Sequence, residues 1–209
     1  MTILALEFST EQRSVALLRE GGAPVSAVET GGFRKTNAFS LIERVLMAAE
    51  ATREEIGVIA VGLGPGSYAG IRAAIAVAQG WQLARDVKLL GVGSVEAMAA
   101  RAQAERVFGR VQVVVDAQRG EFYLATWDIS EEKRTAISAL KIVTATELAE
   151  RVRSGDRCVG PAAETVLFPD AATVARLAEK RTDFVAGESL EPVYLRETTF
   201  VKAPSGRNV

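Results

Sequence analysis

The chain has 209 residues, 48% of them hydrophobic and 24% charged, with a formal net charge of −1. This balance predicts a globular protein with a substantial core and gives no sign of bulk electrostatic capture of nucleic acid. The chain contains no histidine and one cysteine. The composition therefore excludes a histidine general base, a Ser-His-Asp triad, histidine metal ligands, a cysteine zinc cluster and an intrachain disulfide.

The single Cys158 suits a reducing compartment. The chain does not open with a segment of the signal-peptide type, and no apolar run is long enough to span a bilayer. We therefore expect a cytoplasmic protein without membrane contact.

The first residues of the chain predict three strands, at 3–8, 14–18 and 25–28, separated by turns. Glu7, Ser9 and Thr10 stand where the first strand ends. A carboxylate and two hydroxyls at such a place fit a magnesium–phosphate site. They fit equally well a turn in which the hydroxyls bond to the backbone, and both interpretations stay open.

Residues 36–51 predict a helix whose apolar side chains cover about half of its circumference, more than the roughly 100° stripe of a helix lying on one sheet. Met47 stands among polar residues on this helix. Either the helix is deeply set and Met47 is an ordinary exposed side chain, or one flank of the helix meets a partner. The candidate interface residues on this flank are Phe39, Ile42, Leu46 and Met47.

A glycine-rich corner follows, between a strand at 58–61 and a second long helix at 68–84. Gly64 and Gly66 permit positive φ, and Ser67 can cap the helix. Such a corner can hold an anion. It lacks the lysine of a P-loop and the spacing of a dinucleotide fingerprint, so the residues favour a tight structural turn.

The helix at 68–84 carries no charge between Arg72 and Arg85. Ala69, Ala73, Ala76 and Gly80 recur at i, i+4, i+7 and i+11, and form what we call the small-residue stripe. Such a stripe lets a second helix approach closely. That second helix is either the helix at 36–51 of the same chain or a helix of a partner.

The rest of the chain continues the alternation of strands and helices. We expect strands at 88–91, 111–115, 121–127 and 157–160, a helix that Ser94 caps and that ends near residue 106, and helices at 144–153 and 169–181. Asp116 is a further carboxylate at a strand end. The second half echoes the first in shortened form, which predicts an α/β protein with an N-terminal lobe at 1–105 and a shorter C-terminal lobe at 106–209. The tail from residue 191 is expected to be extended and to pack back on the first lobe, with a frayed end at 203–209.

Five segments stand in order along nearly the whole chain and together resemble the TsaB (YeaZ) family. They are residues 3–10 (ILALEFST), 64–72 (GPGSYAGIR), 91–97 (GVGSVEA), 116–123 (DAQRGEFY) and 192–196 (PVYLR).

This resemblance implies an actin-like ASKHA fold of the ribonuclease H-like kind, with two lobes, mixed sheets flanked by helices and a reduced second lobe. It implies a non-catalytic dimerisation subunit of the bacterial machinery that attaches threonylcarbamoyl to the adenosine beside the anticodon of tRNA. The implied partners are the catalytic subunit TsaD, bound through the two long helices, and the ATPase TsaE, which joins the pair. A homodimer uses the same surface in the absence of TsaD, and tRNA is reached only through the complex. No cofactor, metal or catalytic residue of this chain is implied.

The sequence departs from the family pattern at two places. Glu7 stands where the family has Asp, in the motif that other members of the superfamily use with Mg-nucleotide, and Tyr68-Ala69 replaces Phe-Thr. An alternative function is a stand-alone ASKHA ATPase or phosphotransferase. Its candidate nucleotide or anion site, vestigial under the first hypothesis, is Glu7, Ser9, Thr10, Gly64, Gly66, Ser67 and Asp116. A peptidase is the third hypothesis, and the sequence disfavours it because it offers neither a metal site nor a histidine base.

Overall fold

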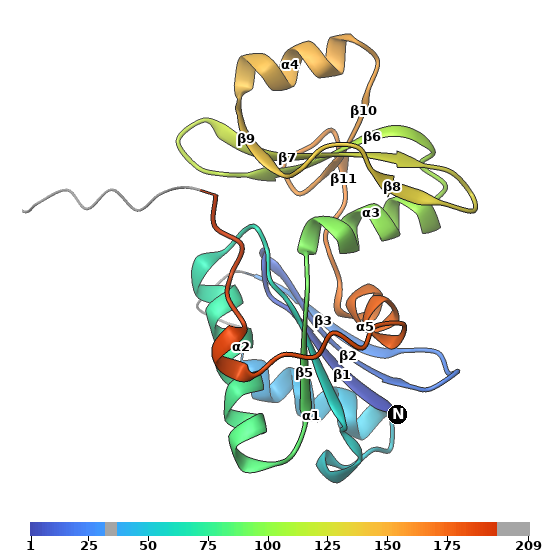
Figure 1. The fold of residues 1–209 in the computed structure, drawn as a ribbon, viewed down its shortest axis with the longest axis vertical. Coiled ribbons are helices and arrows are strands. Elements are labelled where there is room, and N and C mark those ends of the chain that lie inside the picture. The colour runs from blue at the N-terminus through green and yellow to red at the C-terminus, as the bar shows by residue number, and fades with distance from the viewer. Residues whose placement is uncertain (32–36, 196–209) are drawn as a thin grey trace, which may run out of the picture.

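The structure is a computed structural model, and it describes residues 1–31 and 37–195. It contains two sheets, one above the other in Figure 1. The first sheet has the strand order β3-β2-β1-β4-β5. Its strands are β1 (Thr2–Glu7), β2 (Gln12–Arg19), β3 (Val25–Thr30), β4 (Val58–Gly62) and β5 (Lys88–Val92). The first three are antiparallel neighbours, and β4 and β5 run parallel to β1.

Helices cover both faces of the first sheet. On one face lie α1 (Ala38–Ala48) and α2 (Tyr68–Ala84), and on the other lies α5 (Ala171–Glu179) (Figure 1). Strand β1 is therefore buried on both sides: Leu4 and Leu6 belong to the apolar cluster under α1 and α2, and Ile3 and Ala5 to the cluster under α5. This explains why β1 reads as a continuous apolar run rather than an alternating one.

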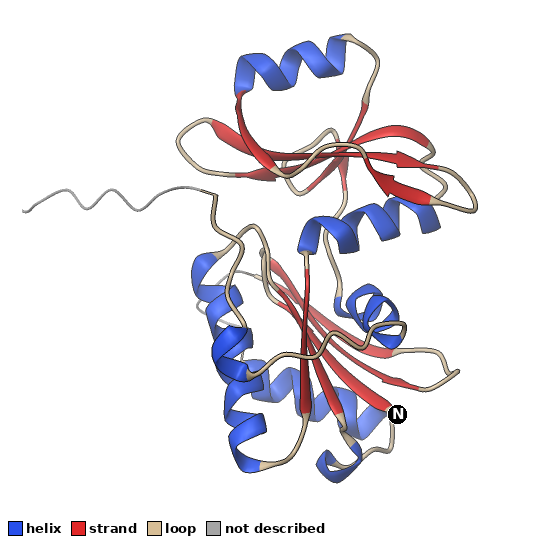
Figure 2. Cartoon of the chain, in the orientation of Figure 1, coloured by secondary structure: helices blue, strands red, loops and turns tan. Residues whose placement is uncertain are grey.

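The second sheet has the order β11-β10-β6-β7-β8, and β9 also pairs with β7. Helix α3 (Ser94–Ala104) lies on its lower face, toward the first sheet, and α4 (Ala145–Arg153) on its upper face (Figure 2). The strands are β6 (Gly109–Asp116), β7 (Glu121–Ile129), β8 (Arg134–Ala136), β9 (Lys141–Thr144), β10 (Arg157–Gly160) and β11 (Thr165–Val166). Two short 3-10 helices, η1 (Arg53–Glu55) and η2 (Gly187–Ser189), complete the elements of the described residues.

After α5 the chain runs back along the first sheet as a strap, residues 185–195. Val185 bridges to Leu89, the backbone carbonyl of Gly187 accepts a hydrogen bond from Gln79, and the N–H of Val193 donates to the carbonyl of Leu63. Residues from the second half of the sequence thus lie on the first sheet. The domain boundary near residue 105 stays a prediction. Helix α5 and the strap follow that boundary in the sequence but pack against the first sheet.

Most of the predicted elements are confirmed, with ends shifted by a few residues. Helix α2 has the predicted bounds, with Ser67 as its cap accepting from the N–H of Gly70 at 3.1 Å. Helix α1 begins at Ala38 after the cap Asn37, and residue 36 lies outside the described residues. The prediction that Ser94 caps α3 is wrong, because Gly93 is the cap and Ser94 is the first residue of the helix.

The short strands β8, β9 and β11 were not predicted. Of the predicted extended tail, residues up to 195 belong to the strap, and residues 196–209, including the frayed end, lie outside the described residues. No helix in the described part of the chain is both long enough and apolar enough to cross a membrane.

Candidate partner interface and interlobe cleft

The small-residue stripe lies on the outer face of α2. Ala69, Ala73, Ala76 and Gly80 are all exposed, and a Cβ added at Gly80 would have no atom within 4 Å. Helix α1 of the same chain therefore does not fill the stripe, and this alternative is wrong. A mid-helix glycine costs about 1 kcal/mol relative to alanine, and no contact within the described monomer requires Gly80.

Leu83 extends the stripe and was missed by the sequence analysis. It stands three residues after Gly80, on the same face of α2, and its side chain is 89% exposed. A leucine at this exposure next to exposed alanines makes the outer face of α2 apolar. The sequence could have indicated this position, because a residue three places after Gly80 lies on the same face of a helix.

The predicted interface residues of α1 separate into two pairs. Phe39 and Met47 are 57% and 79% exposed. Ile42 and Leu46 are 1% and 7% exposed and belong to the core cluster between α1, α2 and the first sheet. The structure therefore places Ile42 and Leu46 in this chain's own core, and Phe39 and Met47 are the α1 residues that face solvent.

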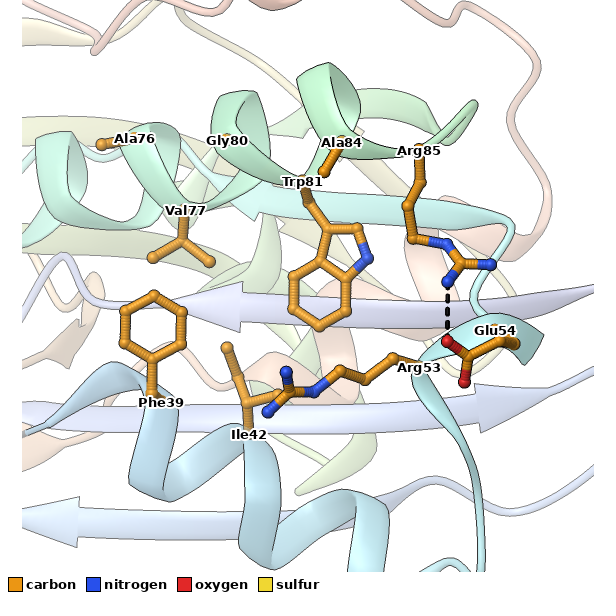
Figure 3. A pocket seen from close by; sticks show the side chains of 10 residues that line it. All are labelled: Phe39, Ile42, Arg53, Glu54, Ala76, Val77, Gly80, Trp81, Ala84 and Arg85. Atoms are coloured by element: carbon orange, nitrogen blue, oxygen red, sulfur yellow. Dashed lines mark hydrogen bonds and ion pairs between the residues drawn. The ribbon is translucent and has the colours of Figure 1, made fainter.

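A groove of about 740 Å³ lies between α1, η1 and α2. Figure 3 shows the indole of Trp81 extending from α2 toward Ile42, and the ring of Phe39 facing Val77. Ion pairs stand at one end of this α1–α2 groove: Arg85 with Glu54 at 2.8 Å, and Arg53 with Glu43 at 2.9 Å. Such exposed pairs add little stability, but they place charges of both signs beside an apolar groove, an arrangement that serves specificity. The full lining is Phe39, Ile42, Arg53, Glu54, Ala76, Val77, Gly80, Trp81, Ala84 and Arg85.

A second groove, of about 420 Å³, lies on the other side of α2, between the helix and the strap. Ala76 lines both grooves, so the two depressions meet on either side of the small-residue stripe at this residue. Near the start of α2 the ring of Tyr194 from the strap stacks on Tyr68, with centroids 5.3 Å apart. The strap thus lies along one side of the exposed face of α2.

A cleft of about 610 Å³ lies where the first sheet faces the second. Its lining includes most of the predicted nucleotide or anion site, namely Ser9, Thr10, Gly66, Ser67 and Asp116. Glu7 and Gly64 do not line this interlobe cleft. The other lining residues are Glu11, Tyr68, Val115, Ala117, Gln118, Tyr123 and Pro161.

Glu7 does not line the cleft and is fully buried. One carboxylate oxygen accepts a hydrogen bond from the backbone N–H of Ser9 at 2.8 Å, and the other accepts from the hydroxyl of Ser94 at 2.7 Å. The Ser94 hydroxyl in turn accepts from the N–H of Gly64 at 3.0 Å. The carboxylate therefore joins the end of β1, the glycine-rich corner and the start of α3, and the role of Ser94 in this network was not predicted.

Burial raises the pKa of Glu7 above its ordinary value of 4.5, although the hydrogen bonds from Ser9 and Ser94 act in the opposite direction. The folded protein consequently binds this proton more tightly than the unfolded chain does. The stabilisation from Glu7 is complete below pH 4.5 and is lost as the pH rises through the folded pKa.

Replacing Glu7 by glutamine is expected to remove this pH dependence. The difference in unfolding free energy between wild type and Glu7→Gln should fall as the pH rises from 4.5 and then level off. Denaturant unfolding from pH 4 to pH 9 measures it, with the exposed Glu132→Gln as the control for loss of one charge. A pH-independent difference would contradict the assignment of a raised pKa.

The two mixed sheets, with helices on both faces and a cleft between them, define an actin-like α/β protein of the ASKHA class. The fold matches YeaZ from Pseudomonas aeruginosa with a TM-score of 0.78 and 28% identity, over 93% of this chain and 99% of that chain. The model of the TsaD family, described as tRNA N6-adenosine threonylcarbamoyltransferase, matches residues 35–184. The chain belongs to this family, within its TsaB (YeaZ) branch.

Curated relatives agree over their full length. The protein of Escherichia coli K12 called tRNA threonylcarbamoyladenosine biosynthesis protein TsaB is 28% identical, over 99% of this chain and 100% of its own length. The protein of the same name from Haemophilus influenzae is 28% identical, over 98% of each chain. The resemblance read from the five sequence segments is confirmed, and so is the predicted fold class.

Proposed function

We propose that this protein is a non-catalytic subunit in the biosynthesis of tRNA threonylcarbamoyladenosine, and that it binds and activates the catalytic subunit TsaD. The names of the full-length relatives support the pathway, and the match to the TsaD family model supports a partner of related fold. Two related folds that present the same helices can associate about a pseudo-twofold axis.

The exposed apolar face of α1 and α2 carries the proposal. Phe39, Met47 and Leu83 protrude from it at 57%, 79% and 89% exposure, beside the small-residue stripe. An apolar patch rimmed by charged pairs is typical of protein–protein contact sites. The stripe allows a partner helix to approach the backbone of α2 closely, and the protruding side chains can enter grooves on the partner.

The proposed contact is a four-helix arrangement, two helices from each subunit. Two copies of this chain use the same face when TsaD is absent, and TsaE joins the pair that this chain forms with TsaD. The tRNA is reached only through the complex. Within this proposal Ile42 forms the floor of the α1–α2 groove, and Leu46 supports α1 from the core.

Reconstitution of tRNA modification tests the function directly. Purified TsaD, TsaE and the remaining components should modify tRNA when this protein is present and fail when it is omitted. Co-elution of this protein with TsaD in size-exclusion chromatography should accompany the activity. Full modification in its absence, or a failure of the two proteins to co-elute, would contradict the proposal.

The protein alone is expected to show no ATP turnover above the buffer blank. The carboxylate that an ATPase of this fold would use, Glu7, is fully buried, hydrogen-bonded to Ser9 and Ser94, and absent from the lining of the cleft. A phosphate-release assay with and without Mg²⁺ measures the turnover. Hydrolysis that disappears in Glu7→Ala would favour the stand-alone ATPase instead.

A further inference from the structure

Within the described residues the chain passes between the two sheets at two places. Strand β5 of the first sheet ends at Val92 and leads into α3, which packs on the second sheet (Figure 1). Strand β11 of the second sheet ends at Val166, and α5, which lies on the first sheet, begins at Ala171. Hinges of two-lobed proteins are a few loop or element-terminal residues of this kind. The contacts at these two crossings therefore decide whether the sheets move relative to each other.

The first crossing is held by a buried network of hydrogen bonds. The N–H of Ser94 donates to the carbonyl of Gly64 at 2.8 Å, and the N–H of Gly64 donates to the Ser94 hydroxyl at 3.0 Å. The N–H of Leu63 donates to the carbonyl of Val92 at 2.8 Å. The Ser94 hydroxyl donates in turn to the carboxylate of Glu7 at 2.7 Å, and both of these residues are fully buried. A buried network whose members are bonded to one another makes its surroundings rigid.

Gly62 makes room for this network. A Cβ at Gly62 would overlap Oε2 of Glu7, which is the oxygen that accepts from Ser94. Any larger residue at position 62 would push the carboxylate away from α3. The absence of a side chain at Gly62 therefore allows the long side chain of Glu7 to reach the start of α3.

The second crossing is held by Arg101, also from α3. Ser94 and Arg101 are about two helical turns apart and lie on one face of the helix. The guanidinium of Arg101 donates to the carbonyl of Phe168 at 2.8 Å and pairs with Asp170, the cap of α5, at 3.2 Å. Ala97, between them on the same face, belongs to the apolar cluster of α5 and the first sheet. This face of α3 is therefore joined to both crossings.

An adjacent flank of α3 belongs to the second sheet. Met98, Ala99 and Ala102 are fully buried in the apolar cluster that this sheet forms with the helix. Helix α3 therefore cannot follow a movement of the second sheet without breaking its hydrogen bonds to the first. We propose that the contacts of Ser94 and Arg101 hold the two sheets as one rigid body, so that the interlobe cleft keeps its width whether or not a ligand is present.

A distance measured between spin labels on the two lobes tests this proposal. Arg176→Cys on α5 and Glu150→Cys on α4 place the labels at exposed helical positions, in a Cys158→Ala background because Cys158 is the chain's only cysteine. Dilution with unlabelled protein restricts double electron–electron resonance to distances within one chain. One narrow distance distribution is expected, and addition of Mg-ATP should not shift it.

Removing the contacts of α3 should broaden this distribution. Ser94→Ala should broaden it, and Ser94→Ala/Arg101→Met should broaden it further. Amide exchange of Leu63 should become faster by about tenfold or more in Ser94→Ala, because a hydrogen bond to a carboxylate is lost. Ser14→Ala is the matched control: its fully buried hydroxyl accepts from the N–H of Ala171 at 2.8 Å, a bond between β2 and α5 on the first sheet alone. The control should keep the distribution of the wild type.

Four outcomes would overturn the proposal. These are a broad distribution in the wild type, a shift of the wild-type distance by Mg-ATP, a wild-type distribution in the folded double variant, and equal broadening in Ser14→Ala. Circular dichroism checks folding, and Ser94→Ala, which lacks a single hydroxyl, decides the question if the double variant does not fold. The labelled and substituted positions line neither groove of α2, so the result does not depend on binding of TsaD.

Discussion

Replacing Ala76 by arginine is expected to leave a folded monomer that associates neither with a second copy nor with TsaD. Ala76 is exposed on the outer face of α2 and lines the grooves on both sides of the helix. Arginine is a good helix former, so the fold tolerates it. In the proposed contact its charge would be buried without a partner, at a cost of about 3–5 kcal/mol, which is a loss of roughly two to four orders of magnitude in affinity.

Light scattering, circular dichroism and co-elution with TsaD measure these effects. Ala104→Arg is the matched control, because Ala104 is also an exposed alanine on a helix and lies on α3, away from both grooves. The control should associate as wild type. A folded Ala76→Arg that still co-elutes with TsaD would place the interface elsewhere. Loss of only one of the two associations would show that they use different surfaces.

Replacing Gly66 by valine is expected to destabilise the fold strongly. Gly66 has φ +150°, and a Cβ there would lie 2.1 Å from the backbone carbonyl oxygen of Ser9. The clash is with backbone, so no side chain can move aside. Backbone strain and overpacking each cost about 1–3 kcal/mol, so we expect the free energy of unfolding to fall by about 2–6 kcal/mol.

Denaturant unfolding of Gly66→Val and Gly57→Val measures this effect. A Cβ at Gly57 meets no atom within 4 Å, and Gly57 is not among the glycines of positive φ. The control should change stability by no more than about 1 kcal/mol. If Gly66→Val kept its stability and instead lost a ligand of the interlobe cleft, the corner would be a binding element rather than a structural turn.

Local patterns were sufficient to predict most elements of this fold. The capping box of Thr144 and Glu147 opens α4 as expected, and the glycine-rich corner leads into α2 at the predicted residue. These features depend on contacts within a few residues, which the sequence displays directly. The short strands β8, β9 and β11 depend on pairing with distant neighbours, and their own residues carry too weak a pattern to predict them.

The candidate sites were predicted less completely, because side-chain direction depends on packing. Periodicity placed Ile42 and Leu46 on an apolar flank of α1, but whether that flank faces the sheet or solvent depends on where α2 lies. For the same reason the sequence left open whether α1 covers the small-residue stripe. The sequence predicted Ser94 as a helix cap, but its hydroxyl donates a hydrogen bond to Glu7, 87 residues earlier in the chain.

The position of α5 has a consequence for synthesis of the chain on the ribosome. The face of β1 and β2 that α5 covers is built from residues 3–18, whereas α5 ends at residue 179. Synthesis proceeds at about 5–20 residues per second, so roughly 10–30 seconds pass between the emergence of these strands and the emergence of α5. During that interval Ile3, Ala5, Ala16 and Leu18 form an uncovered apolar face. This face stays uncovered until α5 has emerged, so we expect the first sheet to complete its folding late in synthesis.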